Sequence, residues 1–72
     1  MENILEILRD CFAEQAEEHR IAASNERLWA KGAPDQETAE MHEDNAMFNM
    51  QLADIYENMA KDVLNIVEKY SF

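Results

Sequence analysis

The sequence predicts an all-α fold, an antiparallel hairpin of two long helices that forms one domain over residues 1–72. Two observations predict it. The only glycine and the only proline, Gly32 and Pro34, lie two residues apart near the middle of the chain. The segments on either side are rich in Ala, Leu, Glu, Met and Gln, which are strong helix formers. Two helices joined by so short a connection pack as antiparallel neighbours.

The first helix is expected over residues 3–31. Asn3 followed by Glu6 resembles a capping box, in which both side chains bond free backbone N–H groups. Cys11 is expected to be a small buried thiol within the apolar stripe. At about 100° per residue, one stripe of the helix collects these residues: Ile4, Leu5, Leu8, Cys11, Phe12, Ala16, Ala22, Ala23 and Trp29.

The turn is expected at residues 32–34 and the second helix at about 35–70. Gly32 can adopt the left-handed conformation just past a helix end. Pro34 cannot continue the helix, and Asp35 can cap the next one.

The apolar face of the second helix covers about half of its circumference, more than one neighbouring helix can bury. This width predicts a four-helix bundle made from two hairpins, a homodimer. Its members are Phe48, Leu52, Ile55, Tyr56, Met59, Ala60, Val63, Leu64, Ile66, Val67 and Tyr70.

The second helix is also longer than the first. If the turn centres near residue 33, residue 3 faces residue 63 and everything beyond has no partner within the chain. Monomers rarely expose such an apolar patch, so we expect it to pack on a second subunit, or else to dock a different protein. The predicted oligomer interface is Leu64, Ile66, Val67, Tyr70 and Phe72.

Length and charge limit the function. A chain of 72 residues buries only about 60% of its unfolded surface, so its core needs reinforcement. Cys11 is the only cysteine, which excludes an internal disulfide and favours self-association. A net charge of −10, from 16 acidic and 6 basic residues, argues against direct binding to nucleic acid or to an anionic membrane. A basic protein partner is compatible with it.

The N-terminus carries no basic segment, and no apolar run approaches the ~18 residues of a membrane span. We therefore expect a cytoplasmic protein.

Six polar residues interrupt the apolar stripes, and all lie in the half of the hairpin nearest the turn. The register brings Glu26 near His42, and His19 near Asn45 and Asn49. Three interpretations stay open: solvated ends that splay apart, a buried polar layer that selects the helix pairing, or a cleft for a small ligand. With the neighbouring tryptophan, the ligand-binding candidates are His19, Glu26, Trp29, His42, Asn45 and Asn49.

Neither a metal nor a cofactor is predicted. His42-Glu43 begins like the zinc protease motif, but Ala46 stands where the second histidine is required. His19 and Glu26 are about 10 Å apart along the axis and cannot share an ion. With no histidine beside Cys11 to activate it, no catalytic residue is predicted and the protein is expected not to be an enzyme.

Acidic side chains form a band on the outer face of each helix. Solvation explains part of this pattern, but like charges on a rigid helix can also imitate nucleic-acid phosphates. The sequence therefore favours a small inhibitor or regulator that binds a larger, basic, nucleic-acid-binding protein, with an oligomeric ligand-sequestering protein as the alternative. The predicted partner-binding residues are Glu14, Glu17, Glu18, Glu40, Glu43 and Asp44.

These acidic clusters also loosely resemble those of all-helical nucleotide pyrophosphohydrolases, which use carboxylates from two adjacent helices to hold magnesium on a triphosphate. The resemblance implies a third candidate, a metal-dependent enzyme.

Overall fold

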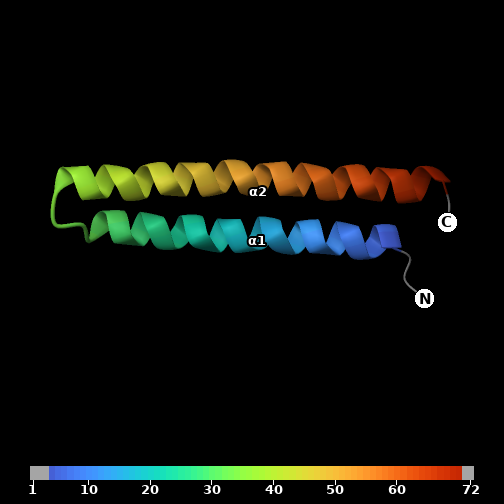
Figure 1. The fold of residues 1–72 in the computed structure, drawn as a ribbon, viewed down its shortest axis with the longest axis horizontal. Coiled ribbons are helices and arrows are strands. Elements are labelled where there is room, and N and C mark those ends of the chain that lie inside the picture. Colours follow the sequence, from blue (N-terminus) through green and yellow to red (C-terminus); the bar gives the residue numbers. More distant parts are fainter. Residues whose placement is uncertain (1–3, 71–72) are drawn as a thin grey trace.

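The computed structural model describes residues 4–70 as two antiparallel helices, α1 (Ile4–Lys31) and α2 (Gln36–Tyr70), joined by a short turn (Figure 1). The predicted all-α hairpin is confirmed. The molecule is a narrow rod with extents of 54 × 18 × 11 Å. Within the described residues, neither helix contains a segment long and apolar enough to cross a bilayer. Asn3, the predicted cap of the first helix, lies outside the described residues.

The end of α1 differs from the prediction for Gly32. Its N–H donates to the carbonyl of Leu28 at 3.3 Å, and the N–H of Ala33 donates to the carbonyl of Ala30 at 3.3 Å. Gly32 does not adopt a left-handed φ. The prediction was wrong because these bonds carry the right-handed coil one residue past the end of α1.

The start of α2 is capped as predicted. The Asp35 carboxylate accepts a hydrogen bond of 2.7 Å from the backbone N–H of Thr38, and the Asp35 carbonyl accepts from Ala39 at 3.1 Å. The helix itself begins at Gln36, one residue later than expected, because Asp35 serves as its cap.

The core between the helices is built mainly from alanine, and Val63 is the one other buried side chain among the described residues. Five alanines at seven-residue intervals on the two helices are buried, and we call them the alanine ladder. A seven-residue interval keeps side chains on one side of a gently supercoiled helix, and methyl groups let two backbones approach closely. Among the described residues no large side chain is fully buried. The alanine ladder consists of Ala16, Ala23, Ala46, Ala53 and Ala60.

Cross-helix pairs beside the alanine ladder set the register. The Phe12 and Tyr56 rings lie 6.2 Å apart, and hydrogen bonds join His19 to Asn49 and Glu26 to His42. All three pairs place residue 4 opposite residue 64, two residues from the predicted register. The reason is the late start of α2, which moves the centre of the turn past residue 33.

This register shortens the overhang of α2, which Figure 1 shows extending past α1 at the end nearest the termini. Leu64, predicted to lie beyond α1, is half-buried opposite its first residues. Val67 is also half-buried, whereas Ile66 and Tyr70 are exposed. Phe72 lies outside the described residues.

The contact surface between the two helices, which we call the seam, is narrower than the predicted apolar stripes. Ile4, Leu8, Cys11 and Trp29 were expected to pack on the partner helix, yet all are exposed. The expectation of a buried thiol at Cys11 was wrong for the same reason. Because the helices contact each other through alanines, only the two rows of residues that face the other helix directly are covered.

Several large apolar side chains beside the seam stay uncovered on one side of the hairpin, which we call the apolar flank, while Ile7, Ile21, Leu28 and Met47 are exposed elsewhere. The other side carries charged residues, including an ion pair between Arg20 and Glu57. By helical position, the apolar flank contains the exposed residues Leu8 and Trp29 of α1 and Met41, Phe48, Ile55, Met59 and Ile66 of α2.

Candidate functional site

The polar layer nearest the turn joins Glu26 of α1 to His42 of α2. The His42 Nδ1–H donates to the Glu26 carboxylate at 2.5 Å, with side chains only 20% and 17% exposed. The Trp29 ring lies 5.7 Å from the His42 ring and tilted to it. The predicted proximity of Glu26 and His42 is confirmed.

A second polar layer lies two turns further from the turn. The His19 Nδ1–H donates to the Asn49 side-chain oxygen at 2.9 Å, and its ring stacks on Tyr56 with centroids 5.6 Å apart. The Asn49 side-chain amide in turn donates to the carbonyl of Asn45 at 2.9 Å. The proximity of His19 and Asn49 is confirmed, whereas the Asn45 side chain is exposed beside the layer.

These layers are internally satisfied. Within residues 4–70, no buried side-chain nitrogen or oxygen lacks a hydrogen-bond partner. A slip of one heptad would set Glu26 against Asn49 and leave His42 without its carboxylate. The geometry therefore fits a polar layer that selects the pairing register, because buried polar groups penalise pairings that leave them unbonded.

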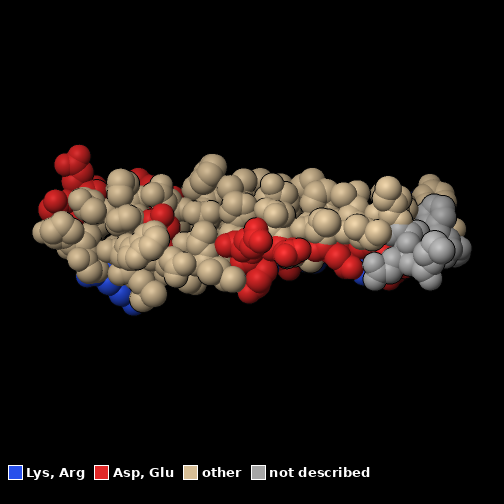
Figure 2. Space-filling view, turned by 60° about the horizontal axis from the view of Figure 1, so that its bottom comes forward, with Lys and Arg blue, Asp and Glu red and all other residues tan. Residues whose placement is uncertain are grey.

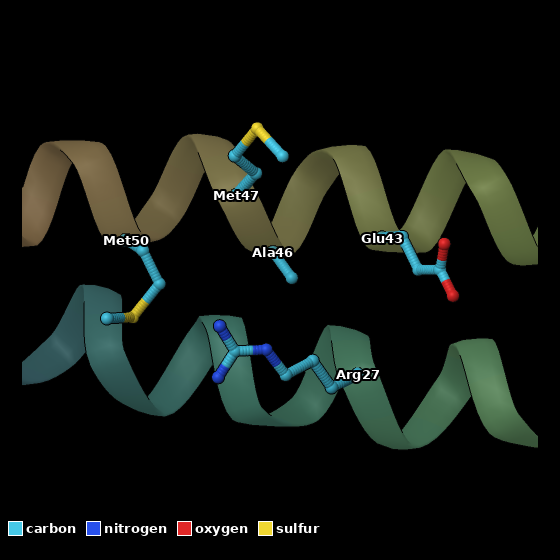
Figure 3. A pocket seen from close by; sticks show the side chains of 5 residues that line it. All are labelled: Arg27, Glu43, Ala46, Met47 and Met50. Carbon is cyan, nitrogen blue, oxygen red and sulfur yellow. The ribbon is translucent and has the colours of Figure 1, made fainter.

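Two shallow, open hollows of about 280 and 350 Å³ lie on the charged side of the hairpin. Arg27 and Glu43 line both of them, and Met47 and Met50 line the first. Figure 3 shows Arg27 extending along α1 toward Met50 and away from Glu43. None of the six predicted ligand-binding residues lines either hollow, since those residues lie in the seam or on its other side.

All six predicted partner-binding carboxylates are exposed. They form two groups: the α1 group is Glu14, Glu17 and Glu18, and the α2 group is Glu40, Glu43 and Asp44.

The two acidic groups do not merge. The register places Glu17 level with residue 51, so the groups are separated by about 10 Å along the rod. Figure 2 shows carboxylates gathered near the middle of one face and again toward the turn, with uncharged surface between them. Among the described residues, no group of three or more His, Cys, Asp and Glu side chains could hold a metal ion.

The basic residues neutralise little of this surface. Arg9 pairs with its neighbour Asp10 at 2.9 Å, and Arg20 bridges to Glu57 on α2 rather than to the α1 or α2 acidic group. Exposed pairs of this kind contribute little stability. Within residues 4–70, no ion pair joins a basic residue to the α1 or the α2 acidic group.

Comparison with known proteins assigns no family: no family model, no curated protein and no solved structure matches the chain.

The apolar face predicted for the second helix did not include Ala46 and Ala53, which are buried at the centre of the seam. Their seven-residue interval, continued at Ala60, was the available signal.

Proposed function

We propose that this chain is a small, acidic, non-enzymatic interaction module that inhibits or regulates a larger, basic protein. The observation that carries the proposal is the pair of exposed acidic groups, neither of which has a basic ion-pair partner among the residues that the structure describes. The helical backbones fix the positions from which these side chains project, so a partner would have to order the side chains but not the backbone on binding.

Charge favours such a partner over other classes. A net charge of −10 on an 8.4 kDa chain attracts a basic surface and accelerates encounter. The attraction acts over about 8 Å at physiological ionic strength, so the contact weakens as salt increases. By contrast, a ligand-sequestering role finds less support, because His19, Glu26, His42 and Asn49 already bond one another.

The proposal includes a homodimeric four-helix bundle. The apolar flank and the acidic residues Glu17, Glu40 and Glu43 lie on different sides of the hairpin by helical position. A second hairpin could therefore cover the first and leave the second free for a partner.

The test removes the α2 acidic group with a triple variant, Glu40→Gln, Glu43→Gln and Asp44→Asn. A control, Asp54→Asn with Glu68→Gln, removes two exposed carboxylates elsewhere on α2.

Proteins captured by the wild type would be identified, and the most enriched basic one purified for titration. At roughly 0.5–1 kcal/mol per contact charge, the triple variant is expected to bind about tenfold or more weakly. The control should bind like the wild type, and the wild-type affinity should fall steeply with salt. A salt-insensitive complex, or one that the triple variant retains, would refute the proposal.

A further inference from the structure

A second apolar stripe runs along α2, next to the column that faces α1, and we call it the outer stripe. Its members follow one another at alternating intervals of three and four residues, the spacing of a coiled-coil seam. Three of its large side chains, Phe48, Ile55 and Met59, are 60%, 54% and 38% exposed. The outer stripe consists of Asn45, Phe48, Leu52, Ile55, Met59 and Asp62.

We propose that a second copy of this chain covers the outer stripe, with its α2 antiparallel to the first α2 about a two-fold axis between Leu52 and Ile55. This inference rests on the self-association proposed above and adds the face, the direction and the register.

The pattern of the outer stripe is self-complementary. Its intervals read the same from either end, so in the antiparallel pair Leu52 meets the second copy's Ile55 and Phe48 meets its Met59. Two-fold dimers require this property, because each residue and its counterpart exchange places across the axis.

The polar members of the outer stripe select this direction. In the antiparallel pair Asn45 meets the second copy's Asp62, and an amide N–H can donate to a carboxylate. In a parallel pair Asp62 would meet its own copy, and like charges that face each other are destabilising. An antiparallel register thus accommodates both polar residues.

Charge along the border of the outer stripe also permits two acidic chains to meet. The residues on its outward border are Asp44 and the amides Gln51, Asn58 and Asn65, so Asp44 is the one charged residue in that column. Asp54 and Glu57 lie around the helix toward the charged side, by helical position. Repulsion between two chains of charge −10 is therefore smaller at this face than at the charged side.

The exposed area agrees with one missing partner. A compact monomer of this mass exposes about 4600 Å². The hairpin exposes 5385 Å². The excess of about 800 Å², to which the rod shape itself contributes, is of the size that each partner buries in a standard interface.

Disulfide trapping tests the register in a Cys11→Ser background, with Phe48→Cys and Met59→Cys made as separate chains. Both side chains are exposed in the hairpin, so neither change disturbs its seam. Mixing the two variants under mild oxidation should yield a cross-linked dimer, whereas each variant alone should not cross-link. In the antiparallel pair, like positions are separated by about 16 Å along the axis, beyond disulfide reach.

A second variant tests the polar pair. Asn45→Asp sets two carboxylates together and should weaken self-association at least tenfold, while Asn58→Asp, which adds the same charge outside the outer stripe, should weaken it less. Cross-linking of Phe48→Cys or Met59→Cys alone would indicate parallel pairing and overturn the inference while sparing self-association. A wild-type chain that stays monomeric would overturn both.

Discussion

Enlarging the centre of the alanine ladder tests the close approach of the two helices. Ala53 is 0% exposed and Ala16, opposite it, is 1% exposed. Ala53→Leu adds three carbon atoms where two backbones already meet through methyl groups. Overpacking of this kind costs about 1–3 kcal/mol, since either the helices separate or the new side chain takes a strained rotamer.

The expected loss is large for so small a protein. At about 0.05–0.15 kcal/mol per residue, a chain of this length has a stability of roughly 4–11 kcal/mol. Each kcal/mol lowers Tm by about 4–8 °C in a domain of this size. We therefore expect Tm to fall by roughly 5–20 °C.

The assay is thermal unfolding followed by circular dichroism at equal protein concentration, because self-association makes Tm concentration-dependent. Ala13→Leu is the matched control, since Ala13 is exposed on α1 and the substitution is the same. It should change stability by no more than about 0.5 kcal/mol. Hydrophobicity alone predicts a more stable Ala53→Leu protein, and that result would refute the close packing of the alanine ladder.

Substitutions at three further positions probe the polar layer, the turn and the cap of α2. Glu26→Ala leaves the half-buried His42 without its acceptor and should cost about 1–3 kcal/mol in urea unfolding, with Glu26→Gln costing less. Gly32→Ala should raise stability by about 0.4–1 kcal/mol, because Gly32 has no left-handed φ and a Cβ there meets no atom closer than 4.0 Å; a destabilised variant would contradict this. Hydrogen bonds from Thr38 lower the pKa of Asp35 below its ordinary 3.8, so its carboxylate stabilises the fold above that value. Asp35→Ala should therefore be less stable at pH 7, and its deficit should shrink as pH falls below 3.8; a constant deficit would exclude the charged cap.

The hairpin could be predicted from sequence because its signals are local. Gly32 and Pro34 interrupt two long helix-forming segments, and Asp35 occupies the cap position that its side chain favours. The positions at which the helices end determine their register. The predicted register was two residues from the observed one, which was close enough to bring Glu26 beside His42.

The identity of the seam could not be read from hydrophobicity. Alanine contributes little apolar area, so Phe48, Leu52 and Ile55 dominated the expected face of α2, although Ala46 and Ala53 occupy its centre. The broad apolar face of α2 consists of two adjacent stripes. One of them packs against α1, and the other is uncovered. Which stripe faces α1 depends on how closely the backbones approach, and side-chain size decides this in favour of the smaller residues.

The acidic residues illustrate a second limit. Their outward direction follows from helical periodicity, but whether the α1 and α2 groups form one stripe depends on the register. The same register that pairs His19 with Asn49 keeps Glu17 and Glu43 at different heights along the rod.

The most direct measurement of the central claim is the mass of the full chain by sedimentation equilibrium, over a concentration range from about 1 to 100 μM because association depends on concentration. A hairpin whose apolar flank binds a second copy should sediment at twice the chain mass of 8.4 kDa and dissociate on dilution. A mass of 8.4 kDa at every concentration would contradict the claim, since the apolar flank would then be exposed in a stable monomer.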